Sequence, residues 1–224
     1  MTQLKEATVS VHKRLVAVTI LIVLVPLALS ACGGSGTGST SVSAGLPILT
    51  LDYFAGAGGA LAKTLDPAQV TDSTAADTIA LVNANLVHIL PNNRVAPDLA
   101  TWTVDSSRTV YTFTMRPNAR FANGHRVTAE DAAWSITRAL APATASPVAE
   151  SYLGLIRGAS AYSTGKVQSV SGLKVLGKRT LQITITQPAA YFLMTLSYPT
   201  ADVLDPAVVR HKPAGATGNF LTQT

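Results

Sequence analysis

Few residues in this 224-residue sequence belong to types that carry out covalent or metal chemistry. Each histidine of the folded part has an ordinary structural explanation: His88 lies in an apolar stretch, His125 in a polar turn and His211 beside a lysine. None has a second ligand at metal spacing, and no nucleophile is paired with a base. The glycine-rich residues 56–59 lack the Gly-Lys-Ser/Thr of a phosphate-binding loop. The sequence therefore predicts no enzyme, no metal site and no cofactor.

Cys32 is the single cysteine of the chain, and its position suggests modification. Lys13 and Arg14 precede an apolar run over residues 15–29, which ends in Leu29-Ser30-Ala31-Cys32. Positive charge, a short apolar core and small residues before a cleavage point are typical of a secretory signal. The Leu-Ser-Ala-Cys ending resembles the bacterial lipobox, in which the cysteine is diacylated and becomes the new N-terminus. The alternatives are an ordinary signal peptide with a chance cysteine, or a short anchor helix.

Composition divides the rest of the chain and excludes one class of partner. Residues 32–45 are rich in glycine, serine and threonine, so we expect a flexible tether between the signal peptide of residues 1–31 and a folded part over residues 46–224. The formal net charge is +5, but the basic residues are scattered and do not gather with aromatic residues. This pattern argues against a nucleic-acid-binding surface.

Hydrophobic periodicity predicts an α/β fold with a mixed sheet in which hairpins dominate. Strands are expected over residues 46–54, 86–90, 99–104, 109–116, 173–176 and 180–186. Helices are expected over residues 73–84, 128–140 and 191–196, with a weaker, glycine-interrupted helical stretch over 148–161.

Several local signals fix details of these elements. Ser73 or Thr74 is expected to cap the first helix, with Ile79 and Val82 on its inner face. Thr128 is expected to cap the helix that follows the turn at Asn123-Gly124, with an acidic residue at the third helical position.

The run over residues 109–140 is more specific than these general patterns. Its strand places Tyr111, Phe113, Met115 and Arg116 before a Phe-x-x-Gly turn, and Thr-Ala-x-Asp opens the helix that follows. This run resembles the signature of the family 5 extracellular solute-binding proteins, the dipeptide-, oligopeptide- and nickel-binding group. Further landmarks of that family occur in the expected order: Leu65-Asp66-Pro67, Pro97-Asp98-Leu99-Ala100 with Trp102, Gly158-Ala159 before Tyr162, Pro188-Ala189-Ala190-Tyr191-Phe192 and Gly215-Ala216-Thr217-Gly218-Asn219-Phe220.

The resemblance implies a periplasmic-binding-protein type II-like fold, of which this chain would form only the first lobe. It implies capture of peptides or a similar small solute, delivery to the permease subunits of an ABC transporter, and a monomer held by lipid on Cys32 at the outer face of the cytoplasmic membrane. Members of the family are much longer, so the chain is expected to be truncated. The alternative is a truncated surface lipoprotein, or gene remnant, with an interaction role and no part in transport.

The resemblance also suggests where ligand contacts would lie. Tyr53 and Phe54 follow the first strand, Asn85 follows the first helix, and Tyr198 lies near the expected edge between lobes. These four residues are the candidate ligand contacts, although Tyr53 and Phe54 would serve equally well as core residues. Asp66 and Asp98 stand beside or near prolines, where carboxylates commonly bond the backbone of a turn.

Overall fold

The computed structural model describes residues 64–210. The predictions for the strand over residues 46–54, for the tether and signal boundaries, and for Cys32, Tyr53, Phe54 and His211 lie outside the described residues. Among the described residues, no helix is both long and apolar enough to span a bilayer.

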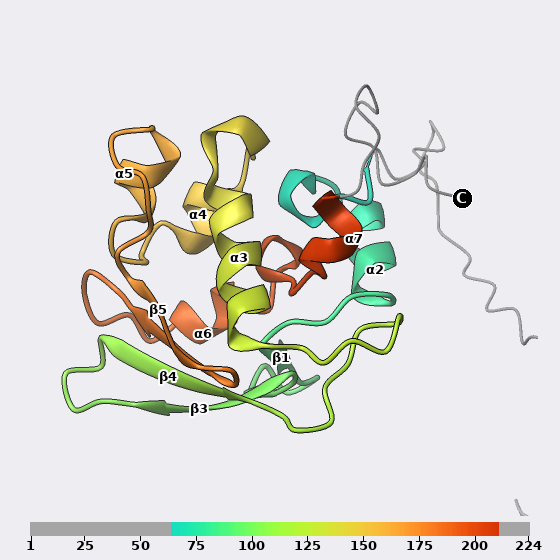
Figure 1. The fold of residues 1–224 in the computed structure, drawn as a ribbon, viewed down its shortest axis with the longest axis horizontal. Helices are drawn as coiled ribbons and strands as arrows, with labels where there is room; N and C mark the ends of the chain where they lie inside the picture. Colours follow the sequence, from blue (N-terminus) through green and yellow to red (C-terminus); the bar gives the residue numbers. More distant parts are fainter. Residues whose placement is uncertain (1–63, 211–224) are drawn as a thin grey trace, which may run out of the picture. The chain divides into compact units, whose positions relative to one another are not determined.

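A four-stranded antiparallel sheet forms the base of the described fold, in the order β3-β4-β6-β5 (Figure 1). The strands are β3 (Ala100–Val104), β4 (Val110–Met115), β5 (Leu173–Gly177) and β6 (Thr180–Thr184). The strands predicted over residues 99–104 and 109–116 pair as the β3–β4 hairpin, and those predicted over 173–176 and 180–186 pair as the β5–β6 hairpin. Every strand pair within residues 64–210 is antiparallel, so the mixed pairing that we expected is not found in this part of the chain.

The inner face of the sheet is apolar because the strands alternate as their sequences predict. In β4, Tyr111, Phe113 and Met115 are buried, while the residues between them point away from the core. Leu181 and Ile183 of β6 are buried on the same face, directly paired with Phe113 and Tyr111. A period of two places alternate residues on opposite faces of a strand. One face of the sheet therefore builds the core.

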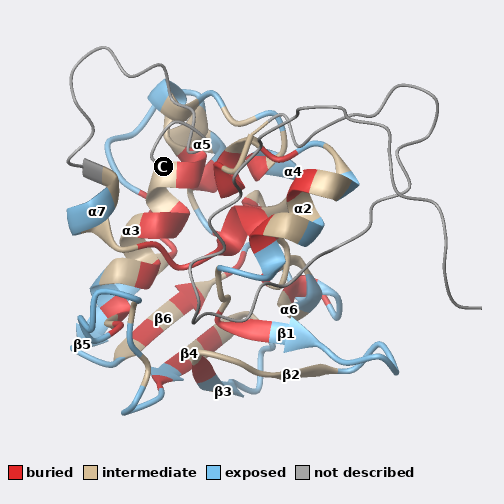
Figure 2. Cartoon of the chain, turned by 90° about the vertical axis from the view of Figure 1, so that its right-hand side faces the viewer, coloured by how far each residue is buried: buried red, intermediate tan, exposed pale blue. Residues whose placement is uncertain are grey.

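Helix α3 (Ala129–Leu140) covers that inner face of the sheet (Figure 1). It begins with the predicted capping box: the side chain of Thr128 accepts a hydrogen bond from Asp131 N, and Asp131 Oδ2 accepts one from Thr128 N at 2.9 Å. Ala132, Ile136 and Leu140 lie on its buried side. Figure 2 shows the buried residues concentrated between this helix and the strands.

Short helices complete the cover over the core. The glycine-interrupted stretch forms α4 (Ala149–Leu153) and α5 (Ala159–Ser163), separated by Gly158 at φ 81°. The predicted helix after Pro188 is α6 (Phe192–Thr195). The remaining short turns of helix are η1 (Pro67–Gln69), η2 (Pro142–Thr144), η3 (Pro199–Ala201) and α7 (Pro206–Arg210).

The first helix differs from its prediction at both ends. Helix α2 (Ser73–Ala80) is capped by Asp72, whose side chain accepts from Ala75 N at 2.8 Å, rather than by Ser73 or Thr74. It ends four residues early, so Ile79 is buried as expected but Val82 is 75% exposed. The prediction for Val82 was wrong because the chain leaves the helix before that residue.

The predicted edge strand is β1 (Val87–Ile89), and it pairs with β2 (Val95–Pro97), which the sequence did not predict. The pair is separate from the larger sheet, although β2 runs directly towards β3. Pro91, Asn92 and Asn93 lie in the turn between the two strands, with Asn93 in the left-handed region at φ 60°.

Candidate functional site

Two segments that are far apart in the sequence meet at the end of α2. Residues 83–85 lie against residues 198–204, and we call these two segments together the polar junction. Val203 N donates to Ala84 O at 3.0 Å, which joins the two backbones. Asn83 Nδ2 donates to Asp202 Oδ2 at 3.0 Å. Helix α2 ends at Ala80, so residues 83–85 belong to the non-helical chain that follows it.

Asn85 and Tyr198, the two candidate ligand contacts within the described residues, are brought together here. Asn85 Nδ2 donates to the backbone carbonyl of Tyr198 at 3.1 Å. The backbone N–H of Asn85 donates to Asp98 Oδ2 at 3.2 Å. Asn85 is therefore held through both its backbone and its side chain. Asp98 bonds a backbone group, as the sequence predicted, but that group belongs to a neighbouring segment and not to the turn of Asp98 itself.

The ring of Tyr198 stacks on the ring of Tyr152, with centroids 3.9 Å apart and planes within 5° of parallel. Tyr198 also packs against the small cluster formed by Val70 and by Ala75 and Ile79 of α2. Partial burial is the main cause that raises the pKa of the Tyr198 hydroxyl, followed by the neighbouring Tyr152 and Asp72. The stacked pair thus forms a half-buried aromatic surface.

Asp202 is the buried acid of the polar junction. Asp202 is 4% exposed, and burial raises the pKa of its carboxyl to about 7. Hydrogen bonds from Asn83 and Asn85 oppose this rise, and the neighbouring charge of Asp98 adds to it. Sequence reasoning missed this residue. The available signal was an acid inside the apolar run Ala201-Asp202-Val203-Leu204, because acids are seldom buried without a specific partner.

A cavity of about 460 Å³ lies beside the polar junction. Its walls are mainly apolar and come from the chain after α2, the turn before α3 and helix α7; they include Leu81, Val82, Phe121, Val127 and Val208. Asn83 and Ala84 line it, whereas Asn85 and Tyr198 do not.

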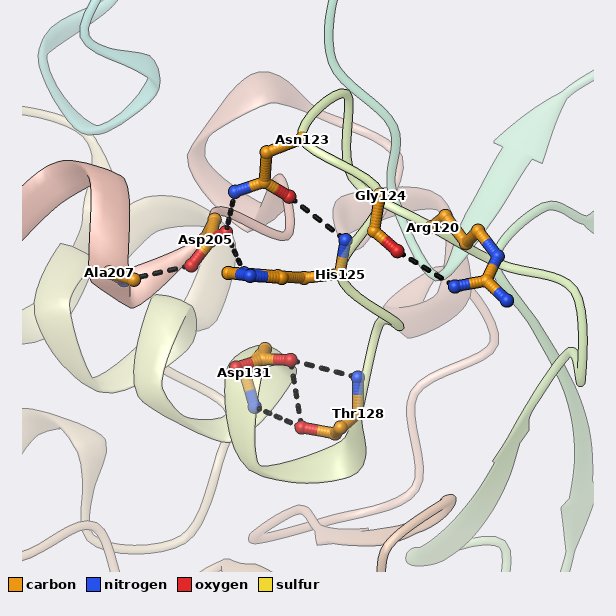
Figure 3. Close-up of polar contacts among 8 residues, drawn as sticks. All are labelled: Arg120, Asn123, Gly124, His125, Thr128, Asp131, Asp205 and Ala207. Atoms are coloured by element: carbon orange, nitrogen blue, oxygen red, sulfur yellow. Dashed lines mark hydrogen bonds and ion pairs between the residues drawn. The ribbon is translucent and has the colours of Figure 1, made fainter.

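The turn before α3 borders this cavity and is held by hydrogen bonds (Figure 3). Asn123 Nδ2 donates to Asp205 Oδ2 at 2.6 Å, and His125 Nδ1 lies 3.2 Å from the same oxygen. Partial burial opposes ionisation of Asp205, but the hydrogen bonds from Asn123, Ala207 N and His125 outweigh it and hold its pKa below the usual value. His125 therefore ties the turn to α7.

The other acidic and basic groups singled out by the sequence have structural roles. Asp66 bonds Ala68 N at 3.1 Å, as predicted for a turn, and also forms a two-point ion pair with Arg138 of α3, which the sequence did not reveal. His88 is exposed on β1. Within residues 64–210, no three histidine, cysteine or acidic residues are grouped so that they could hold a metal ion. The polar junction offers hydrogen-bonding groups and an aromatic face, which suit non-covalent binding.

The family model of the bacterial extracellular solute-binding proteins, family 5 middle, matches residues 94–223, more than half of the chain. The chain belongs to this family.

Several curated relatives share part of their sequence with the chain. It is 36% identical over 141 residues to the probable deoxycholate-binding periplasmic protein YgiS of Escherichia coli, covering 61% of the chain and 26% of YgiS. It is also 36% identical over 115 residues to the dipeptide-binding protein DppE of Bacillus subtilis, covering 50% of the chain and 21% of DppE. The chain therefore spans about a quarter of the length of the curated relatives it matches.

Solved structures confirm the fold class. The Listeria monocytogenes OppA bound to peptide superposes with a TM-score of 0.65 and 26% identity, covering 69% of this chain and 31% of that one. The unliganded open form of the murein tripeptide binding protein MppA gives a TM-score of 0.63 and 27% identity, covering 67% and 30%. The described residues thus have the α/β fold of part of a type II periplasmic binding protein.

Proposed function

We propose that this chain is the first part of an extracytoplasmic solute-binding lipoprotein that captures peptides, or a similar small solute, for an ABC importer. Membership of the family carries this proposal, since the relatives are named for binding dipeptides, oligopeptides or deoxycholate. The protein performs no bond chemistry. The mechanism is the closure of two lobes around the solute. Closure needs only that the solute makes more favourable contacts with the closed state than with the open state.

Asn85 and Tyr198 are proposed to face the solute together with Tyr53 and Phe54. Their mutual contact supports this for the first pair, because a residue that positions a ligand works best when its own side chain is held in place. The Tyr152–Tyr198 stack would supply a rigid aromatic face for a solute with varied side chains.

A thermal-shift titration tests solute binding. The protein encoded by the complete locus is titrated with di- to pentapeptides, a bile acid, nickel complexes and sugars. We expect one class of solute to raise the melting temperature, since a ligand that binds only the native state stabilises it. Tyr198→Phe, which keeps the stack and removes the hydroxyl, should reduce the shift less than Tyr198→Ala. A flat response to every class would count against transport and favour the surface lipoprotein without a transport role.

The lipid anchor is proposed on Cys32, and the protein is proposed to stay at the outer face of the cytoplasmic membrane as a monomer that meets the permease subunits there. One acyl chain binds a membrane only marginally, so the diacylated cysteine supplies the two chains needed for stable anchoring. Mass spectrometry of the mature N-terminus should show a diacylglycerol on Cys32, and Cys32→Ser should move the protein out of the membrane fraction. An unmodified thiol on the mature protein would refute the anchor and leave solute binding untouched.

A further inference from the structure

The second half of the described chain has an uneven charge distribution. Between Glu150 and Asp202 there are five basic residues and no acidic one: Arg157, Lys166, Lys174, Lys178 and Arg179. All five are exposed, and within residues 64–210 none of them takes part in an ion pair. Three of them fall within six consecutive residues at the turn of the β5–β6 hairpin. We call residues 174–179, Lys-Val-Leu-Gly-Lys-Arg, the hairpin tip.

The hairpin tip also exposes large apolar side chains. Val175 is 46% exposed and Leu176 is 57% exposed, between Lys174 on one side and Lys178 on the other. A Cβ added at Gly177 would meet no atom within 4 Å, so the space beside Gly177 is open. The register between β5 and β6 shifts at Val175–Gly177, which breaks the regular edge of the sheet there.

The turn residues Lys178 and Arg179 fix the hairpin tip to the body of the domain. Arg179 Nε donates to Met115 O at 2.8 Å, and Met115 N donates back to Arg179 O at 2.8 Å. Ala129 N donates to Lys178 O at 2.9 Å and so joins the tip to the start of α3. This last contact brings Glu130 near the tip, while the Asp131 carboxylate is occupied by the cap of Thr128. The tip therefore presents its apolar residues on a rigid support.

We propose that the hairpin tip docks on an anionic lipid bilayer, with Lys174 and Lys178 at the headgroup phosphates and Leu176 at the headgroup–acyl boundary. Cations that flank an exposed apolar residue suit such an interface, because the headgroups attract the charges and the boundary takes the apolar side chain. The inference rests on the proposed tether, since a domain linked to Cys32 spends its time near a membrane surface. Docking would fix the orientation of a domain that a glycine- and serine-rich segment leaves free to turn.

Co-sedimentation with vesicles tests the charge component. The mature protein, which begins at residue 32 and carries Cys32→Ser so that it cannot be acylated, is mixed with vesicles of phosphatidylcholine and phosphatidylglycerol, or of phosphatidylcholine alone. Lys174→Gln with Lys178→Gln should weaken binding to the anionic vesicles by about fivefold for each lysine. The matched control is Arg94→Gln with Arg108→Gln, two exposed cations elsewhere with the same change in net charge. Equal loss in both variants, or in neither, would overturn the proposal, whatever becomes of solute binding.

A fluorescence measurement tests the apolar component. Leu176→Cys in the Cys32→Ser background is labelled with a polarity-sensitive dye, and Val82→Cys, on another exposed apolar position, is the control. Anionic vesicles should shift the emission of the dye at position 176 to the blue and leave that at position 82 unchanged. Raising the ionic strength from about 0.1 M to about 1 M should reverse the shift, because the Debye length falls from about 10 Å to about 3 Å. A dye that stays in water at position 176 would contradict docking, and binding that also needs a purified permease would point instead to an acidic protein surface.

Discussion

In the sheet and helix α3, the periodic pattern of each element decides which of its side chains are buried. In the polar junction, the residues that bond to one another are more than a hundred positions apart in the sequence. Phe113 faces the core because strand residues alternate, and Thr128 caps α3 through a residue three positions on. Asn85 and Tyr198 are 113 residues apart, and Asn83 and Asp202 are 119 residues apart. The first region is apolar inside, and the second buries a carboxylate. The comparison suggests that the first supplies stability and that the second is free to supply recognition.

The largest effect is expected where the core of the sheet is opened. Phe113 is fully buried, and its strand neighbours in register are Trp102 and Leu181. Phe113→Ala should lower the free energy of unfolding by about 3–5 kcal/mol, because it removes buried apolar area and leaves a cavity. Urea titration followed by circular dichroism measures the change. Thr114→Ala, on the exposed face of the same strand, is the control and should cost well under half as much. A similar loss in both variants would contradict a core on one face of the sheet.

The next effect concerns Asp202 and depends on pH. Burial raises the pKa of Asp202 to about 7 in the folded protein, well above the ordinary value of 3.8 for an exposed aspartate in the unfolded chain, so the folded state holds the proton more tightly. The contribution of Asp202 to stability is therefore complete below about pH 4 and is lost as the pH rises through about 7. Over that window the loss is a few kcal/mol, on the order of 4 at most.

Asp202→Asn removes the titrating group while keeping a polar side chain of similar size. The free energy of unfolding of this variant should change less between pH 5 and pH 8 than that of the unaltered protein, and at pH 8 it should be higher. Asp77→Asn, an exposed acid on α2, is the matched control and should leave the pH profile as it is. Parallel pH profiles for the unaltered protein and Asp202→Asn would show that Asp202 is already ionised in the fold.

The same contrast explains how much of the structure could be predicted from the sequence. Strands β3 and β4, the capping box of α3 and the turn at Asn123-Gly124, where Gly124 has φ 86°, are each specified by neighbouring residues, and all were predicted. The cap of α2 was misplaced by one or two residues, because Asp72, Ser73 and Thr74 are all good caps and local propensity does not rank them.

The polar junction shows where local reasoning ends. Nothing near Asn83 indicates Asp202, and nothing near Asp66 indicates Arg138, since both pairs form only when the chain has folded. Asn85 and Tyr198 were predicted as ligand contacts through resemblance to a family and not through spacing, and their contact with each other was not predicted. The short strand β2 was missed because three residues ending in proline carry little strand signal.

A smaller effect is expected at the start of α3. Thr128→Ala removes the hydroxyl that accepts from Asp131 N and should lower the free energy of unfolding by about 1 kcal/mol. Thr128→Ser keeps the hydroxyl and should restore most of the loss in the same urea titration. If serine proves as harmful as alanine, the methyl group of Thr128 rather than its cap is what stabilises the helix.

The smallest effect should come from Asn85→Ala, although this residue is central to the polar junction. The variant loses the hydrogen bonds from Asn85 to Tyr198 O and to Asp202. The carbonyl still accepts from Ala201 N at 2.9 Å and the carboxyl still accepts from Asn83 at 3.0 Å, so neither is left unpaired. A hydrogen bond contributes about 0.5–1.5 kcal/mol when no buried partner is abandoned, so the loss in urea titration should fall near the lower end of that range. The affinity of the complete protein for its solute should fall by a larger factor than the stability does. The hydrogen bond from Asn85 holds the backbone at Tyr198, so its loss also frees the Tyr198 ring. A variant that loses stability as much as Phe113→Ala does would place the polar junction with the core, and the distinction between a stabilising and a recognising region would fail.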